Sequence, residues 1–213
     1  MNIVLCGCDG TFKTTIAEKL SEKFKLSIVK GSSFELAQGE NEELYKFSLD
    51  IANSNNQIVD RFIWSNRVYT TLYPEYTALT DKQRETIENT MRDNTIIIYL
   101  TASPDVIVKR LEERGDEYIT SDKVEDIITT YNSVMSDAVH NEMKVYTYDT
   151  GILSSDDIVS QISDMFYTNK SLPAIKCGFC GKLTPRKNSY FSETHCYSCY
   201  SFIMNDLLKN GID

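Results

Sequence analysis

The sequence lacks an apolar run long enough to span a membrane, and it shows no N-terminal signal peptide, because charged and polar residues begin at Asp9. An excess of basic residues is also missing, since the 213 residues carry a formal net charge of −9. That charge argues against broad, nonspecific nucleic-acid binding by the main body of the chain. We therefore expect a cytoplasmic protein with no membrane partner.

Cysteine is scarce until the tail of the chain. Cys6 and Cys8 stand alone near the N-terminus, and the other four form two C-x₂-C pairs separated by fifteen residues. In a reducing cytosol this spacing is typical of structural zinc rather than of disulfides, and metal binding would supply the folding energy of so small a segment. The alternative is a tail of four reduced thiols. The expected zinc ligands are Cys177, Cys180, Cys196 and Cys199.

The tail is therefore predicted to be a separate module. We expect a main domain over residues 1–168, a linker over 169–175, and a zinc-ribbon-like module with a terminal helix over 176–213. Zinc held by four sulfurs has no open position, so no catalysis is assigned to it. A nucleic-acid or protein contact is one task for this module, because it carries basic and aromatic residues: Lys182, Arg186, Lys187, Tyr190 and Phe191.

Strands and helices alternate through the main domain. The apolar patterns predict strands over 3–5, 26–30, 57–60, 95–100 and 145–148. Helices are predicted over 16–24, 41–52, 64–73, 81–92, 105–113, 122–139 and 155–166, with Thr80 and Ser103 as N-caps. This alternation predicts an α/β fold of three layers, in which helices cover both faces of a parallel sheet and ligands bind at the carboxyl ends of the strands.

Residues 7–15, GCDGTFKTT, lie between the first strand and the first helix. A strand, a tight loop and a helix N-terminus form a common cradle for nucleotide phosphates. Lys13 would reach the β- and γ-phosphates of ATP, and the Thr14 hydroxyl would ligate Mg²⁺. The strict pattern G-x-x-x-x-G-K-[ST] has glycine where this chain has Phe12, and the alternative is an ordinary turn with a solvated lysine. The expected phosphate-binding residues are Gly7, Gly10, Thr11, Phe12, Lys13, Thr14 and Thr15.

Two further motifs carry charge near the predicted ligand-binding edge. Asp60 and Arg61 end a strand, where the carboxylate could orient Mg²⁺ through water or accept a proton, and the guanidinium could bind a phosphate. Without the phosphate loop nearby, a surface ion pair would be the preferred explanation. Arg110 and Arg114 share a helix face ahead of Gly115, which suits a lid that closes on a transferring phosphoryl group. The alternative for these arginines is a solvated helix face.

In order and spacing, the three motifs resemble the thymidylate kinase family of P-loop nucleoside monophosphate kinases, most closely its short phage-type members. The resemblance covers about residues 1–168 and implies a P-loop NTPase fold, with a host cytoplasm as location if a phage encodes the chain. It implies that Asp9 and Arg61 bind the acceptor nucleotide, with Phe62 or Phe34 near its base and Tyr69 on the same side. The residues that match the family motifs are Gly7, Asp9, Gly10, Lys13, Thr14, Thr15, Asp60, Arg61, Phe62, Ser65, Tyr69, Arg110 and Arg114.

The expected activity is transfer of the γ-phosphoryl group of ATP to a deoxynucleoside monophosphate, with thymidylate or a modified pyrimidine favoured. Lys13, Asp60, Arg110 and Arg114 would be catalytic, and the cofactors would be ATP, Mg²⁺ and structural Zn²⁺. A deoxynucleoside kinase, a kinase of modified bases in DNA and a nucleotide-binding scaffold disabled by Phe12 remain alternatives. The second strand also lacks the arginine–proline turn of ordinary thymidylate kinases, and the oligomeric state stays open, a homodimer included.

Overall fold

A computed structural model describes residues 1–31, 38–115, 121–167, 174–176 and 183–185 of the chain. Its contacts divide the chain into two units, Met1–Gln161 and Ile162–Asp213. The expected linker over 169–175 lies largely outside the described residues. No helix in the described ranges is both long enough and apolar enough to cross a membrane.

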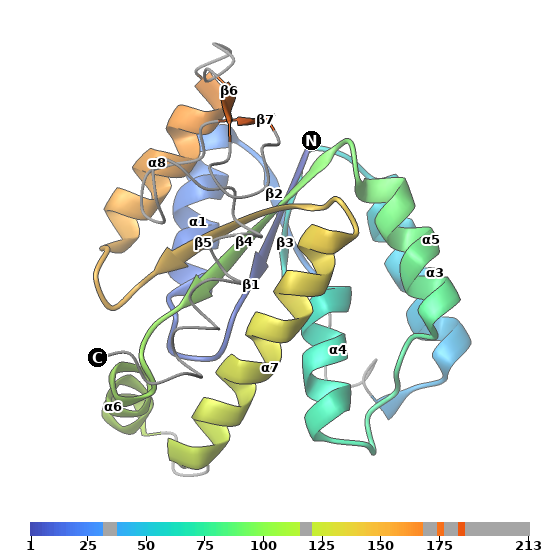
Figure 1. The fold of residues 1–213 in the computed structure, drawn as a ribbon, viewed down its shortest axis with the longest axis horizontal. Coiled ribbons are helices and arrows are strands. Elements are labelled where there is room, and N and C mark those ends of the chain that lie inside the picture. The colour runs from blue at the N-terminus through green and yellow to red at the C-terminus, as the bar shows by residue number, and fades with distance from the viewer. Residues whose placement is uncertain (32–37, 116–120, 168–173, 177–182, 186–213) are drawn as a thin grey trace. The chain divides into compact units, whose positions relative to one another are not determined.

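The centre of the first unit is a parallel sheet in the order β2-β3-β1-β4-β5 (Figure 1). Leu5 of β1 lies opposite Asp60 of β3, and Thr101 of β4 lies opposite Asp149 of β5. Since all neighbouring pairs are parallel, the carboxyl ends of the strands meet at one edge, as the sequence predicted. The strands are β1 (Asn2–Cys6), β2 (Ser27–Lys30), β3 (Gln57–Asp60), β4 (Thr95–Thr101) and β5 (Lys144–Asp149).

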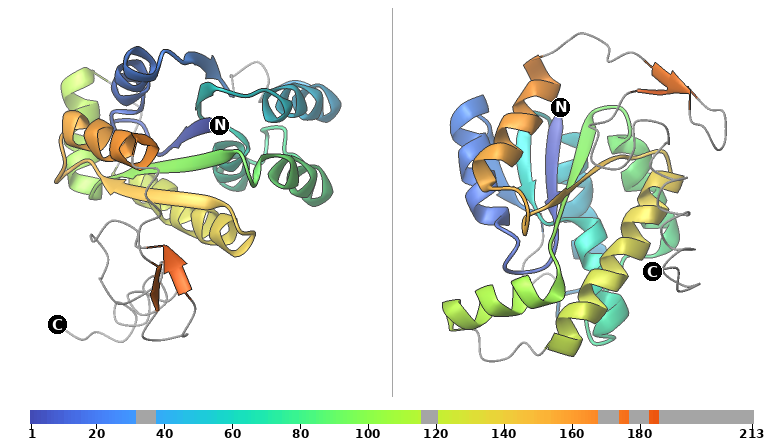
Figure 2. Two further views of the ribbon diagram at one scale, coloured as in Figure 1. Left: turned by 90° about the horizontal axis from the view of Figure 1, so that it is seen from above. Right: turned by 60° about the vertical axis from the view of Figure 1, so that its left-hand side comes forward.

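Helices cover both faces of this sheet. Figure 2 shows α1 on one face and α7 on the opposite face, which confirms the three-layer α/β arrangement. All of β1 and nearly all of β4 are buried between these layers, which accounts for their continuous apolar sequences. The helices are α1 (Lys13–Phe24), α3 (Asn41–Asn53), α4 (Ile63–Leu72), α5 (Asp81–Met91), α6 (Pro104–Arg114), α7 (Ser121–His140) and α8 (Ser155–Tyr167).

Two helix N-termini and one helix C-terminus follow the predicted signals. Thr80 caps α5, because its hydroxyl accepts a hydrogen bond from the Gln83 amide and the Gln83 side chain completes a capping box. Ser103 is the N-cap residue of α6, as predicted: its carbonyl accepts a hydrogen bond from the Ile107 amide at 3.1 Å, although its side chain makes no capping hydrogen bond. The helix then begins with Pro104 in its first turn and ends at Gly115, whose φ of 83° is the left-handed conformation that favours glycine.

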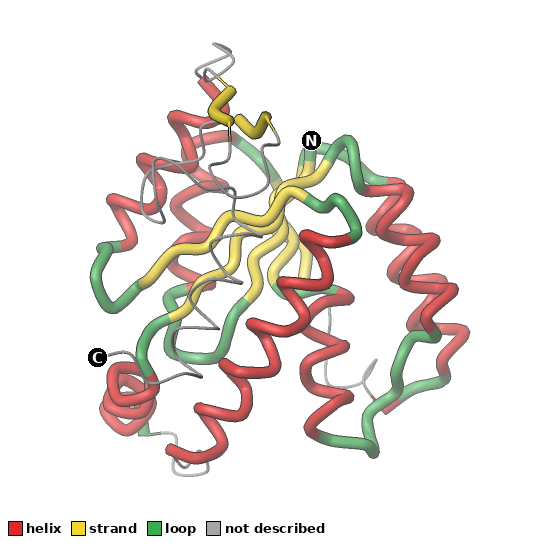
Figure 3. Tube along the Cα trace, in the orientation of Figure 1, coloured by secondary structure: helices red, strands yellow, loops and turns green. Residues whose placement is uncertain are grey.

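The second unit contains a two-stranded antiparallel sheet, drawn in yellow in Figure 3. Strand β6 (Ala174–Lys176) pairs with β7 (Leu183–Pro185), so that Ile175 lies opposite Thr184. Residues 177–182, which connect these strands, include the first C-x₂-C pair and lie outside the described residues. The expected zinc ligands Cys177, Cys180, Cys196 and Cys199 all lie outside them, and so does Phe34.

Candidate active site

The loop after β1 has the backbone of a phosphate-binding loop. Gly7 has a φ of 144°, and a β-carbon there would lie 2.2 Å from the Leu100 carbonyl oxygen, so no other residue fits. Phe12 has φ 61° and ψ 19°, the left-handed conformation that glycine adopts freely. The phenylalanine therefore preserves the path of the loop, at a backbone cost of about 1–2 kcal/mol.

Helix α1 starts directly behind this loop. Its first backbone hydrogen bond runs from the Ile16 amide to the Phe12 carbonyl at 2.9 Å, and no side chain caps the helix. The amides of Lys13, Thr14 and Thr15 consequently have no partner within the helix. Amides exposed at a helix N-terminus favour anions, because the helix dipole adds to their partial positive charge.

A cleft of about 250 Å³ opens in front of these amides. Four cations and two carboxylates line it, which gives it a positive balance in a protein with a net charge of −9. A narrow cleft with this balance suits a chain of phosphates rather than an apolar ligand. The lining residues are Asp9, Gly10, Phe12, Lys13, Thr14, Thr15, Asp60, Arg61, Arg110 and Arg114.

Lys13 lies folded across the loop. Its side chain is buried, Nζ donates to the Cys8 carbonyl at 2.7 Å, and Nζ lies 3.7 Å from Asp9 Oδ1. Burial, followed by repulsion from Arg61, lowers the pKa of Lys13 to about 8. The ammonium therefore sits in an environment that a phosphate anion would improve.

Asp9 and Arg61 form an ion pair beside Lys13. Arg61 Nη2 donates to Asp9 Oδ1 at 2.5 Å, and Nη1 donates to the Tyr69 hydroxyl at 3.0 Å. Burial alone would raise the pKa of Asp9, but Arg61 and Lys13 outweigh it and hold that pKa below its usual value. Asp9 is therefore an anion that orients two cations.

The backbone at Arg61 is also left-handed, with a φ of 62°. Gly31, at the end of the neighbouring strand, donates its amide to the Asp60 carbonyl at 3.0 Å. A β-carbon on Gly31 would lie 2.1 Å from the Arg61 carbonyl oxygen. This close approach sets the position from which the Arg61 side chain enters the cleft.

Asp60 faces the same cleft from the end of β3. Its Oδ1 is buried and has no hydrogen-bond partner among residues of the described ranges. Hard oxygen ligands are what Mg²⁺ prefers, and both this carboxylate and the Thr14 hydroxyl line the cleft. These two residues therefore fit the predicted Mg²⁺ site, and the free oxygen also fits acceptance of a proton.

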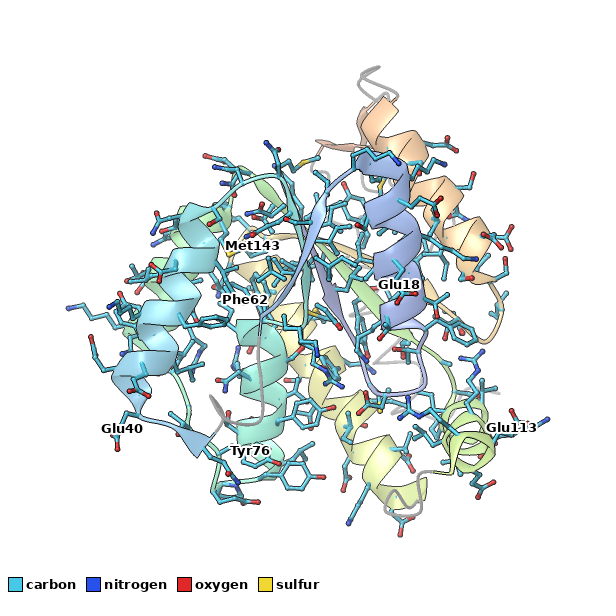
Figure 4. All side chains as sticks on the ribbon, turned by 180° about the vertical axis from the view of Figure 1, so that it is seen from behind. Glu18, Glu40, Phe62, Tyr76, Glu113 and Met143 are labelled. Carbon is cyan, nitrogen blue, oxygen red and sulfur yellow. The ribbon has the colours of Figure 1, made fainter. Side chains whose placement is uncertain are left out.

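Arg110 and Arg114 both reach the cleft from α6. Arg110 donates from Nη1 to the Gly10 carbonyl at 3.0 Å and to Thr150 Oγ1 at 2.9 Å, and from Nη2 to the Thr150 carbonyl at 2.7 Å. Its guanidinium carbon lies 4.1 Å from the centre of the Phe12 ring. Glu113 is exposed and points outward from α6 (Figure 4), whereas Arg110 and Arg114 both line the cleft.

Not every predicted residue reaches the cleft. Phe62 is fully buried and packs edge-to-face against Trp64 with 6.0 Å between ring centres, so it contributes to the core. Tyr69 acts on the cleft indirectly, by holding Arg61, whose guanidinium carbon lies 5.2 Å from the Tyr69 ring centre. The sequence did not single out Thr150 or the Cys8 carbonyl as partners of the site cations, because no sequence pattern marks either contact.

Comparison with known proteins identifies a close relative. The chain is 44% identical to the SPbeta prophage-derived uncharacterized protein YorR of Bacillus subtilis (strain 168), over 160 residues that make up 75% of this chain and 95% of YorR. The crystal structure of YorR in complex with phosphorylated GDP matches with a TM-score of 0.74 at 42% identity, covering 78% of this chain and 95% of that one.

More distant structures share the fold. A deoxyadenosine kinase from M. mycoides matches at 16% identity with a TM-score of 0.54, covering 78% of this chain and 98% of that one. Thymidylate kinase from Candida albicans matches at 18% identity with a TM-score of 0.53, covering 79% of this chain and 92% of that one. The sequence model of the family "Deoxynucleoside kinase" matches residues 29–168. With this match and its identity to YorR, the chain belongs to the deoxynucleoside kinase family, whose members are phosphotransferases with the P-loop kinase fold.

Proposed function

We propose that this kinase transfers the γ-phosphoryl group of ATP to the 5′-phosphate of a deoxynucleoside monophosphate, with thymidylate or a modified pyrimidine nucleotide as acceptor. The observation that carries the proposal is the placement of Arg61. Its guanidinium is held by Asp9 and Tyr69 in the cleft that the first residues of α1 also line. A guanidinium has five N–H donors, so two engaged donors leave others for an acceptor phosphate.

The other residues of the cleft bind the donor phosphates, hold the metal ion and stabilise negative charge. Lys13 and the amides at the start of α1 bind and orient the phosphates of the donor. Thr14 and Asp60 hold Mg²⁺, which neutralises charge on the phosphates when bound. Arg114 lies one helical turn beyond Arg110 and adds positive charge at the same cleft. The catalytic contribution of the chain is thus positioning and electrostatic stabilisation.

An acceptor panel tests this proposal. The full-length protein is mixed with ATP, Mg²⁺ and one acceptor at a time, and ADP and phosphorylated product are measured. The panel pairs each deoxynucleoside with its 5′-monophosphate and includes single-stranded DNA with modified bases. Guanosine nucleotides belong in it, because the structure of the relative YorR contains phosphorylated GDP. Turnover with a deoxynucleoside monophosphate, lost in Lys13→Ala, is the expected result. ATP binding without turnover on any acceptor would favour a nucleotide-binding scaffold.

A deoxynucleoside kinase is the second candidate. The family description favours it, as does the free Asp60 oxygen, which could accept the proton of a 5′-hydroxyl. The pairs in the panel separate the two candidates directly. Turnover on the nucleosides that exceeds turnover on their monophosphates would establish this second activity and remove the role proposed for Arg61.

The tail is proposed to be a structural zinc module in contact with a nucleic acid or a protein. The pairing of β6 with β7 supports this, because Lys176 and Leu183, which flank the segment with the first C-x₂-C pair, lie opposite each other. The division of the chain over 1–168, 169–175 and 176–213 and a cytoplasmic location belong to the same proposal.

A further inference from the structure

We infer that Arg110 is a positioning residue that, together with Phe12, clamps the phosphate loop to the segment after β5 and thereby sets the affinity for the donor nucleotide. The inference deepens the proposed function, since it assumes that the donor phosphates bind at the start of α1. It gives Arg110 a different task from the direct phosphate contact expected of a lid arginine.

The hydrogen bonds of Arg110 carry the first step. Both terminal nitrogens of its guanidinium donate to groups of the protein, the Gly10 carbonyl on one side and Thr150 on the other. Three of its five N–H donors are thus used within the protein, and a phosphate could take these three only if the loop lost its connection to Thr150. Arg110 is therefore arranged to hold the loop rather than to follow a transferring group.

Thr150 gives the clamp a fixed end. It is buried, its amide donates to the Thr101 carbonyl at 2.7 Å, and its hydroxyl donates to the same carbonyl at 3.0 Å. Thr101 is the last residue of β4, a central strand of the sheet. Through Arg110, the Gly10 carbonyl is thus connected to the sheet by a continuous chain of hydrogen bonds.

Phe12 supplies the other contact. Its side chain is 38% exposed although it is apolar, and its ring lies against the guanidinium of Arg110 at 4.1 Å. A cation over an aromatic face is attracted by the ring quadrupole. The contact explains why a strained phenylalanine stands where glycine would adopt the same backbone without strain.

The two contacts fix the loop on both sides of Thr11. Gly10 is held through its carbonyl and Phe12 through its ring, and the amides of Lys13, Thr14 and Thr15 follow immediately. Loosening the clamp would misalign these amides toward the donor. The acceptor side is held by a different contact of the same loop, the pairing of Asp9 with Arg61.

A double-mutant cycle on the full-length protein tests the clamp, with the dissociation constant for ATP·Mg²⁺ as the main readout. Phe12→Gly and Arg110→Ala should each weaken binding by about 5- to 20-fold, and the double variant should be no weaker than Arg110→Ala alone. Arg110→Lys, which keeps the charge but not the paired geometry, should behave like Arg110→Ala. The KM for the acceptor should stay within about twofold throughout.

Losses that multiply in the double variant, or an Arg110→Lys variant that binds ATP normally, would overturn the inference in favour of a direct contact with phosphate. As a control, Phe12→Gly combined with Arg84→Ala on α5 must give independent effects. The same cycle is also measured in the free energy of unfolding without nucleotide. If the wild type binds no ATP, the proposed function fails, and this second measurement still decides the clamp, since absence of coupling there contradicts it.

Discussion

Asp9 and Arg61 lie 52 residues apart in sequence and form an ion pair of 2.5 Å across the ends of two neighbouring strands. Asp9 belongs to the loop after β1, and Arg61 follows β3, which pairs with β1 in register up to Asp60. One carboxylate thus joins the loop that would bind the donor to the guanidinium that would bind the acceptor. A substitution of either residue should therefore affect the binding of the donor and of the acceptor to different extents.

Arg61→Ala should raise the KM for a monophosphate acceptor by about 10- to 100-fold, because a charge-assisted contact of about 1.5–3 kcal/mol is lost. The dissociation constant for ATP·Mg²⁺ should change by less than about threefold, since Lys13 and the α1 amides remain. Steady-state kinetics and nucleotide titration measure the two values. Arg67→Ala is a suitable control, because Arg67 pairs with Asp137 at 2.6 Å, between α4 and α7. Equal losses for donor and acceptor would remove Arg61 from the acceptor side.

Lys13 should make donor binding depend on pH. Its pKa of about 8 in the free protein lies below its ordinary value, and a bound phosphate should raise it, so binding takes up a proton above pH 8. The dissociation constant for ATP·Mg²⁺ should be nearly constant below pH 7 and rise by up to about tenfold for each pH unit above 8. Titration calorimetry in buffers of different ionisation enthalpy detects the proton directly.

Lys13→Ala supplies the control for that measurement. It should bind ATP weakly, lose the rise above pH 8, and lower kcat by at least about 100-fold, because a cation on the migrating group is gone. A pH dependence that persists in this variant would assign it to another group.

The sequence predicted the elements well, because each depends on local patterns. Alternating apolar segments gave the five parallel strands, and the Thr80 and Gly115 signals gave two helix ends. The contacts within the site were beyond reach, since they join segments distant in sequence. Arg110 meets Gly10 at a separation of 100 residues, and nothing local to either residue marks the contact.

Phe12 and Phe62 show the same limit in two ways. Phe12 does not match the glycine that the phosphate-loop pattern requires, yet its backbone has the left-handed conformation that glycine would adopt there. Phe62 follows directly after Arg61 in the motif, yet it is buried in the core, because the chain turns sharply at Arg61. Which of two adjacent side chains faces a cleft depends on that backbone turn, and residue type alone does not specify it.

Gly31→Ala should destabilise the protein by about 1–3 kcal/mol, as expected for overpacking against rigid backbone. The new β-carbon would meet the Arg61 carbonyl oxygen at 2.1 Å and Val59 Cγ1 at 2.5 Å. Urea unfolding measures the loss, and acceptor binding should weaken with it because Arg61 is displaced. Gly115→Ala is the matched control, since it has open space around it and should show only the left-handed backbone cost of about 1 kcal/mol. Equal effects of the two changes would contradict the steric argument.

Truncation after Thr168 should remove one zinc ion per chain and leave nucleotide turnover unchanged, since α8 ends at Tyr167 and the cleft is lined by residues 9–114. Cys177→Ser in the full-length chain should also release the metal, whereas Cys8→Ala, a change in the buried loop cysteine, should retain it. Metal analysis and kinetics on the three variants give the answer. A truncated protein that folds but has lost turnover would show that the tail completes the active site.

The left-handed backbones of Phe12 and Arg61 have a consequence for the laboratory evolution of this enzyme toward higher thermal stability. Glycine at Phe12 would relieve strain of about 1–2 kcal/mol and remove a cation–π contact of about 0.5–1 kcal/mol, so it should raise the melting temperature, whereas glycine at Arg61 would also remove the ion pair with Asp9 and the hydrogen bond to Tyr69. A library screened only for survival at high temperature should therefore enrich glycine at Phe12 and return stable proteins that no longer hold their nucleotides in place. Screening for thermal resistance and turnover together should instead leave these two positions unchanged and place its gains elsewhere in the fold.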